Sequence, residues 1–128
     1  MCSFGVRALS QQEDEDRKRH GVLTYDARDI ARQQISEITL PADFPHNIYV
    51  TFDVDGLDPS VLPATGTPVP GGLGFYQSLD LIASCLRGRR CVGIDIVELA
   101  PVEGQPVSDF TAALISHHLM AMALPSVD

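Results

Sequence analysis

Apolar and polar positions near the start of the chain alternate between strand-like and helix-like spacing. A short apolar run over residues 4–9 predicts a first strand. Ser10 and Glu13 have the spacing of a capping box, and basic residues crowd before Gly21, so we predict a helix between Ser10 and Gly21. Residues 21–25 (GVLTY) predict a second strand. This segment therefore begins an alternation of strands and helices.

The next part of the chain continues this alternation. Asp26 is expected to cap a helix that carries Ile30 and Ile35 and ends before Pro41. Residues 47–54 (NIYVTFDV) are β-branched and aromatic, and they are nearly apolar on both faces. Such a strand is typical of the interior of a parallel sheet, where both faces are covered.

A long loop rich in proline and glycine separates this strand from the last elements. Loops of this length usually bind a ligand or lack order. Beyond it we predict a helix with Leu79, Ile82, Ala83 and Leu86 on one face, a buried strand over residues 91–97, and a long helix from a Ser108 cap to Leu124. The whole pattern predicts an α/β fold, a mostly parallel sheet covered by helices on both faces.

Length, charge and cysteine content narrow the classes of protein that fit. The 128 residues suffice for one domain, residues 1–128. Nine Lys and Arg against seventeen Asp and Glu give a net charge of -8, which disfavours nucleic acid and anionic membranes as partners and favours cationic ligands or metal ions. The three cysteines form no C-x-x-C pair, and neither a leader nor a membrane span is evident. We therefore expect a cytoplasmic protein without a disulfide framework.

Two aspartates mark the end of the strand predicted over residues 47–54. Asp53 and Asp55 are two positions apart, so they point to one face at the carboxyl edge of the sheet, where open α/β sheets bind ligands. Asp58 adds a third acid just beyond them. Oxygen ligands alone favour Mg, Mn or Ca over soft metals. The spacing predicts a metal site, with carboxylates that merely cap the loop as the alternative.

Two other motifs fail on the same residues. A calcium EF-hand loop that begins at Asp53 needs Gly and Glu where Asp58 and Ala64 stand. The haloacid-dehalogenase-like phosphatase motif has Thr where Leu57 stands and needs a lysine downstream, whereas the only lysine, Lys18, lies upstream.

Two longer strings carry a specific resemblance. FDVDGLDPSVLPATGTPVPGGL (residues 52–73) followed by GIDIVELAP (residues 93–101) resembles the ureohydrolases, which include arginases and agmatinases. The upstream GVRALS segment and the last helix also look like the C-terminal half of that family, so the resemblance covers nearly the whole chain. It implies the C-terminal portion of an arginase-like three-layer α/β/α sandwich. It also implies a binuclear Mn²⁺ centre that hydrolyses a guanidinium group and releases urea.

The resemblance assigns roles to individual residues. Asp53 and Asp55 match two metal-binding aspartates of the family. Glu98 matches the acid that pairs with the substrate guanidinium, and Thr67 matches a threonine near the substrate. Taken without the resemblance, Glu98 reads as a surface acid at a strand end, and Thr67 as a hydroxyl that stabilises its turn. Asp58 is expected to support its loop, and Asp95 is expected to do the same inside its strand.

The chain also departs from the family pattern. The Gly-Gly-Asp-His and Asp-Ala-His-x-Asp segments of ureohydrolases are absent, and His20, His46, His117 and His118 lie in no comparable context. The isolated chain is therefore expected to be an inactive part of an agmatinase- or arginase-like enzyme of polyamine metabolism that takes a small cationic guanidino substrate. PATGTP resembles arginases and VELAP bacterial agmatinases, and we favour agmatinase. The alternative is a truncated or diverged paralogue that serves as a structural or interaction subunit. In either case we expect a homo-oligomer.

Overall fold

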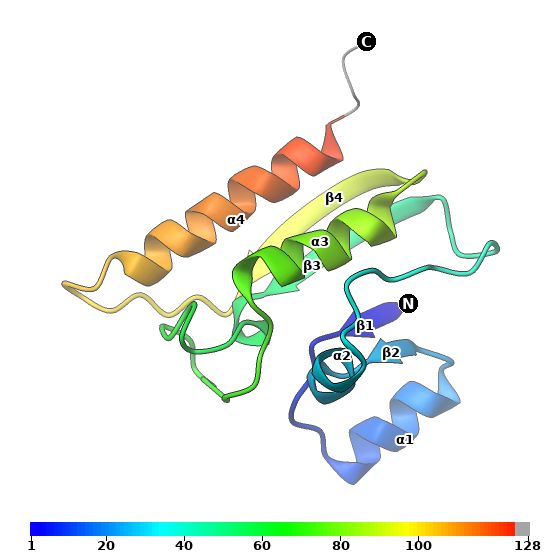
Figure 1. Ribbon diagram of the computed structural model, residues 1–128, viewed down its shortest axis with the longest axis horizontal. Coiled ribbons are helices and arrows are strands. Elements are labelled where there is room, and N and C mark those ends of the chain that lie inside the picture. Colours follow the sequence, from blue (N-terminus) through cyan, green and yellow to red (C-terminus); the bar gives the residue numbers. More distant parts are fainter. Residues whose placement is uncertain (125–128) are drawn as a thin grey trace.

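The computed structural model describes residues 1–124, so the last four residues of the expected domain lie outside it. Strands and helices alternate along the described chain (Figure 1). In order they are β1 (Cys2–Phe4), α1 (Gln11–Arg19), β2 (Leu23–Tyr25), α2 (Ala27–Gln33), β3 (Asn47–Asp53), α3 (Phe75–Leu86), β4 (Arg90–Val97) and α4 (Val107–Ala123). None of these helices has the length and apolar character needed to cross a bilayer.

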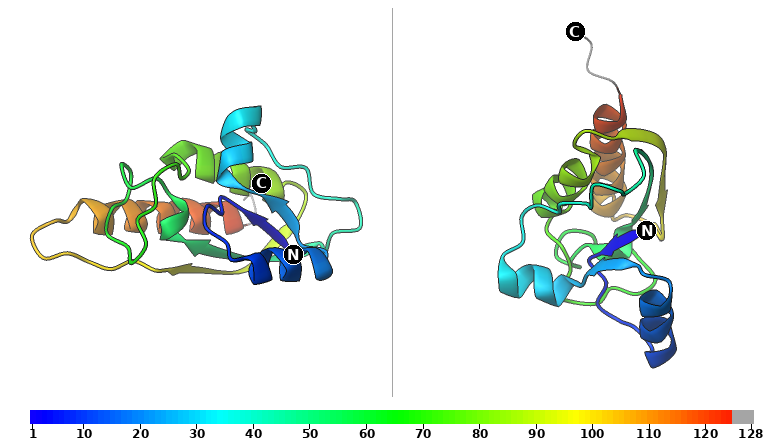
Figure 2. Two further views of the ribbon diagram at one scale, coloured as in Figure 1. Left: turned by 90° about the horizontal axis from the view of Figure 1, so that it is seen from below. Right: turned by 90° about the vertical axis from the view of Figure 1, so that its right-hand side faces the viewer.

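The strands form two parallel pairs rather than one continuous sheet. β1 pairs with β2, and β3 pairs with β4 in a register that sets Asp53 opposite Val97. Figure 2 shows α2, α3 and α4 on one side of the strands and α1 on the other. The arrangement is therefore a three-layer α/β/α fold, as the sequence predicts, although one outer layer contains only α1 within residues 1–124.

Two apolar clusters hold the layers together, and α3 contributes to both. Leu79 and Ile82 pack with Phe52, Leu62 and Ile115 under β3 and β4. Leu81 and Cys85, on the next side of the same helix, pack with Ile30, Ile38, Leu40 and Leu73 beneath β1 and β2. Ala83, which we predicted on the buried face, is exposed because α3 turns its other faces to these two clusters.

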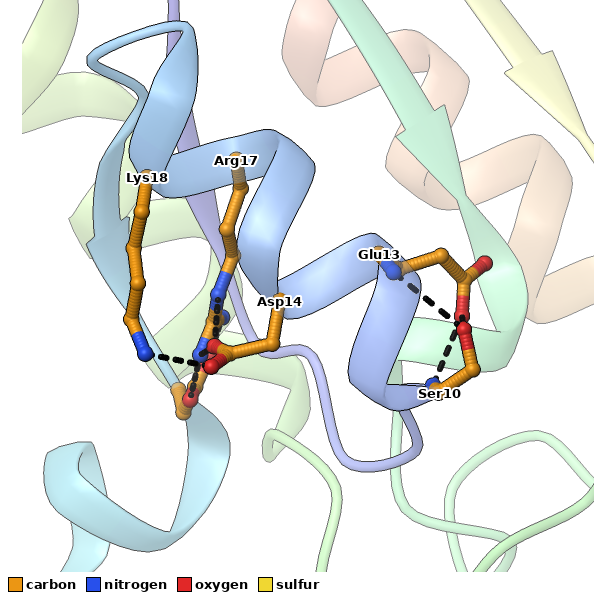
Figure 3. Close-up of polar contacts among 6 residues, drawn as sticks. Ser10, Glu13, Asp14, Arg17 and Lys18 are labelled. Carbon is orange, nitrogen blue, oxygen red and sulfur yellow. Dashed lines mark hydrogen bonds and ion pairs between the residues drawn. The ribbon is translucent and has the colours of Figure 1, made fainter.

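The capping-box spacing of Ser10 and Glu13 correctly predicted the first helix, α1. The Ser10 hydroxyl accepts a hydrogen bond from Glu13 N, and the Glu13 carboxylate accepts one from Ser10 N, which completes the predicted capping box (Figure 3). No residue of α1 is buried. The side chains of Asp14, Arg17 and Lys18 form ion pairs along its surface, as Figure 3 also shows. This helix is therefore stabilised mainly by its cap and its charges.

Two predicted helix caps are wrong in detail. Asp26 does precede α2, but its carboxylate accepts two hydrogen bonds from Arg17, at 2.7 and 3.0 Å, and makes none to the helix. α2 also ends at Gln33, so Ile35 follows the helix. Ser108 lies inside α4, after a Pro106 cap, and is buried where its hydroxyl accepts a bond from Ala64 N. Both side chains are taken by tertiary contacts instead of their own helix ends.

The strands also differ from the prediction. The first strand covers Cys2–Phe4 instead of residues 4–9, because Gly5, at φ +83°, turns the chain out of the extended conformation. β3 and β4 were expected to be buried on both faces, yet Tyr49 is 58% exposed and Val92 is 53% exposed. The described helices beside this pair, α3 and α4, cover one face only. Its outer face is therefore open.

Candidate metal and substrate site

Three acidic residues meet where β3 and β4 end. Asp53 is the last residue of β3, and a short 3-10 turn over Val54–Gly56 carries Asp55 directly after it. Glu98 follows β4, next to Val97, which is the partner of Asp53 in the ladder. Val54, between the two aspartates, is fully buried and anchors the turn in the core. Parallel pairing thus brings three of the predicted site residues to one edge of the sheet.

Hydrogen bonds orient the two aspartates. Asp53 Oδ1 accepts from Asp55 N at 3.0 Å, and Asp55 Oδ2 accepts from Thr67 Oγ1 at 2.7 Å. Among the contacts of residues 1–124, Asp53 Oδ2 and Asp55 Oδ1 receive no hydrogen bond. Each carboxylate is therefore fixed at one oxygen and keeps the other available. Two oriented carboxylate oxygens fit two ligand positions of a hard divalent cation.

The electrostatics of the site also favour a bound cation. Burial raises the pKa of the Asp53 carboxyl above its ordinary value of 3.8, and the negative charges of Asp55 and Glu98 raise it further. The Asp55 N–H opposes this shift by stabilising the ionised form. The carboxylates therefore repel one another as the chain stands, and a positive ion between them would relieve that repulsion.

The loop that delivers Thr67 is held by Asp58. Its carboxylate accepts hydrogen bonds from Ser60 N, Ser60 Oγ, Gly71 N and Gly72 N, at 2.6 to 3.3 Å. These bonds lower the pKa of Asp58 to about 2. At Gly72 an added Cβ would lie 2.4 Å from the Leu57 carbonyl carbon, so only glycine lets the loop return this close. Asp58 supports the loop as expected, without reaching the other two aspartates.

Arg7 is a contributor to the site that the sequence analysis missed. Its guanidinium donates to the carbonyl oxygens of Gly5 and Gly56, both at 3.1 Å, and to that of Asp55. Arg7 therefore fastens the segment after β1 to the turn that carries Asp55. The GVRALS segment was part of the resemblance, but nothing in its pattern distinguishes the arginine from a solvated one.

Glu98 has an unusual backbone. It is exposed and adopts φ +65°, a left-handed conformation that side chains with a Cβ rarely occupy. Such strain clusters at functional sites, where neighbouring structure enforces it. Asp95, in contrast, accepts hydrogen bonds from Tyr49 and Thr51 at 2.9 and 2.6 Å on the open face of the sheet. It braces β3 against β4.

Within residues 1–124, no histidine joins Asp53 and Asp55 in a group that could hold a metal ion. His20, His46 and His117 are exposed at separate places, and His118 packs edge-on against Phe75. Within the part of the chain that the structure describes, no group of three or more His, Cys, Asp or Glu residues is arranged to hold a metal ion. The candidate metal site in residues 1–124 thus consists of Asp53 and Asp55 alone.

Over most of its length the chain is similar to known proteins. A model of the arginase family matches residues 1–124. The chain is 34% identical over 123 residues to the N(1)-aminopropylagmatine ureohydrolase of Synechocystis sp., a match that covers 91% of this chain and 39% of that protein. It is also 51% identical over 70 residues to the agmatinase of Chromobacterium violaceum. This match covers 55% of this chain and 21% of that protein.

A solved structure extends the comparison to the fold. The arginase from Medicago truncatula superimposes with a TM-score of 0.76 at 29% identity, covering 91% of this chain and 37% of that one. The chain therefore spans about two fifths of the length of relatives that match most of it.

Proposed function

Because the chain belongs to the arginase family, we propose that it forms part of a manganese-dependent ureohydrolase. The proposed reaction is hydrolysis of a guanidino compound. The oxygen of water bonds to the guanidinium carbon, a carbon–nitrogen bond breaks, and urea and an amine are released. The observation that carries this proposal is the gathering of three carboxylates and the Thr67 hydroxyl at one sheet edge.

In this proposal Asp53 and Asp55 hold the manganese. Their chemistry fits, because each is oriented through one oxygen and leaves the other for a cation. When bound, the metal would supply water activated for attack at neutral pH. The Asp55 N–H and the Thr67 hydroxyl keep the two carboxylates in place, and Arg7 holds the backbone of their turn.

The substrate part of the proposal rests on Glu98. A carboxylate pairs with a guanidinium through two parallel, charge-assisted hydrogen bonds, which suits Glu98 at the open edge of the site. The acidic cluster would also attract a cationic substrate. We favour agmatine over arginine, since the relatives named above include an agmatinase and an aminopropylagmatine ureohydrolase.

Completion of the site needs groups beyond those described. Two carboxylates are too few for a binuclear centre, so we propose that the remaining ligands come from outside residues 1–124 and that this chain alone is inactive. The same observation favours a second candidate function, a non-catalytic paralogue that acts as a structural or interaction subunit. An experiment that adds a complementary ureohydrolase half to this chain distinguishes the two functions. Urea release from agmatine supports the ureohydrolase, and no release supports the non-catalytic paralogue.

Manganese titration tests the metal site directly. By calorimetry the chain is expected to bind Mn²⁺ weakly, with at most one ion per copy. The double variant Asp53→Asn/Asp55→Asn should lose this binding, because neither amide supplies the negative charge. Asp80→Asn, an exposed change in α3, is the matched control and should bind as the parent does. Two tight sites per chain, or binding that survives the double substitution, would contradict the proposal.

A further inference from the structure

Two of the three cysteines, Cys2 and Cys85, meet in the fold although they lie far apart in the sequence. Cys2 is in β1, and Cys85 is in the last turn of α3. Cys85 belongs to the buried apolar cluster beneath β1 and β2, and Cys2 packs against that cluster. Both are free thiols, and the two lie within hydrogen-bonding reach of each other. The fold therefore brings together two thiols from different layers.

The thiol pair is open to solvent through a cleft of about 920 Å³. Cys2 and Cys85 both line this cleft, together with the apolar side chains of Phe4, Ile48 and Leu73. Cys2 is partly exposed, whereas Cys85 is buried. A small molecule that enters the cleft can therefore reach Cys2, and Cys85 is the more enclosed of the two thiols.

The two thiols differ in how readily they ionise. The Cys85 thiol donates to the Cys2 sulfur, which lowers the pKa of Cys2 below its ordinary value of 9.0, and burial opposes this shift. The same hydrogen bond raises the pKa of Cys85, and burial raises it further. The thiolate is the nucleophilic form of cysteine. Cys2 is therefore the thiol prepared to react, and Cys85 stays protonated beside it.

The third cysteine provides an internal reference. Cys91 is in β4, where its thiol donates to Gly93 O at 3.4 Å. It is partly exposed, as Cys2 is. A reagent that modifies thiols by exposure alone would therefore treat Cys91 and Cys2 alike.

We propose that Cys2 and Cys85 are a redox-active pair, which a hydroperoxide converts into a disulfide between β1 and α3. The Cys2 thiolate attacks one oxygen of hydrogen peroxide, the O–O bond breaks, and Cys2 becomes a sulfenic acid while hydroxide leaves. The Cys85 sulfur then bonds to the Cys2 sulfur, the S–O bond breaks, and the departing hydroxide takes the Cys85 proton to form water. Together the thiols lose two electrons, which reduce the peroxide to water.

The disulfide would affect a segment that supports the candidate site. β1 leads through Gly5 into Arg7, whose guanidinium holds the turn that carries Asp55. Oxidation would restrain this segment against α3, and reduction would release it. A cross-link between distant positions also reduces the freedom of the unfolded chain, so the oxidised chain should be the more stable form.

Peroxide treatment of the full chain, without metal, tests the proposal. After catalase removes the peroxide, free thiols are blocked with iodoacetamide and the chain is digested with trypsin, which places the three cysteines in peptides 1–7, 33–87 and 91–128. We expect mass spectrometry to show peptides 1–7 and 33–87 joined, with the loss of two hydrogen atoms, and Cys91 blocked. Dithiothreitol should separate the joined peptides.

Two comparisons show whether the fold directs this reaction. The same treatment in urea should give at least about tenfold less of the joined peptide, because unfolding removes the proximity of the thiols. Cys91→Ala is the matched control variant and should form the link as the parent does. Cys2→Ala should leave the Cys85 thiol free for blocking.

Stability provides a second measurement. Oxidation should raise the urea midpoint of the parent chain by about 1 M or more, and dithiothreitol should reverse the rise. Cys2→Ala should show no such rise. Equal yields in the folded and unfolded chain, a link that includes Cys91, links only between chains, or oxidation of Cys2 without a link would overturn the proposal. An unreactive Cys2 would do the same. None of these outcomes affects the manganese titration, which tests the proposed function separately.

Discussion

At the scale of single residues, Glu98 combines a proposed substrate role with a strained backbone. Its φ of +65° costs a residue with a Cβ about 1–2 kcal/mol. Glycine escapes this cost but loses more entropy on folding, so Glu98→Gly is expected to raise the free energy of unfolding by up to about 1 kcal/mol. Urea denaturation measures the change.

The control for this prediction is Glu98→Gln, which removes the same charge beside Asp53 but keeps the Cβ. It should gain less stability than the glycine variant. If the two variants are equally stable, or if glycine is the less stable, backbone strain is not what distinguishes this position.

Asp58 gives the chain a specific acid sensitivity. Because hydrogen bonds from Ser60, Gly71 and Gly72 lower its pKa from 3.8 to about 2, its ionised form stabilises the folded chain. That contribution is fully present above pH 3.8 and is lost as the pH falls towards 2. Asp58→Asn should therefore lower the urea midpoint at pH 6 and flatten its fall between pH 4 and pH 2. Asp80→Asn should leave both features unchanged.

At the scale of elements, α1 is expected to depend on its cap because it buries no side chain. Ser10→Ala removes the hydroxyl that accepts the Glu13 N–H, which costs about 1 kcal/mol of helix stability. Hydrogen exchange should become faster in α1, while α4, held by core residues such as Ile115, keeps its protection. Uniformly faster exchange in both helices would show that α1 is instead part of one cooperative core.

The elements that sequence could predict are those decided by local signals. Ser10 and Glu13 define α1 because their bonds reach only three residues. Asp26 and Ser108 carry equally good local signals, but Arg17 and Ala64 N, respectively, take up their side chains. Tertiary contacts decide which of these polar side chains caps its helix. A local sequence pattern does not show such contacts.

The candidate site divides in the same way. Asp53, Asp55 and Glu98 could be predicted to meet because parallel strands end at one edge, and the structure brings them together. The bond from Thr67 to Asp55 joins residues twelve positions apart, and the resemblance had matched Thr67 to a threonine near the substrate without indicating this bond. The role of Arg7 depends on a contact between distant segments, so no pattern near it in the sequence could have revealed it.

At the scale of the whole molecule, the apolar pattern of β3 and β4 predicts strands covered on both faces, whereas residues 1–124 cover only one face. Tyr49, Val92 and Val97 lie on exposed strand surface, and the strand pairs keep unpaired edges. Covering apolar surface is favourable by roughly 25 cal/mol per Å². β3 and β4 therefore expose more apolar surface than the helices and strands of residues 1–124 can cover.

We accordingly expect the purified chain to self-associate or aggregate, and sedimentation velocity is the direct measurement. Co-expression with a complementary N-terminal half of an agmatinase should make it soluble and, under the proposed function, restore urea release from agmatine. A lone monomer with a cooperative melt would contradict the expectation of association. A soluble complex that releases no urea would instead favour the non-catalytic alternative.

The contacts of Arg7 have a consequence for the order of folding. The capping box and the ion pairs of α1 join residues three or four positions apart, whereas Arg7 reaches carbonyls 48 and 49 positions away. Closing so long a stretch of chain costs more entropy and takes longer than forming a helical turn. The Arg7 bonds to the turn that carries Asp55 can therefore form only after both ends of that stretch have met. We expect these bonds to form later in folding than the local bonds of α1.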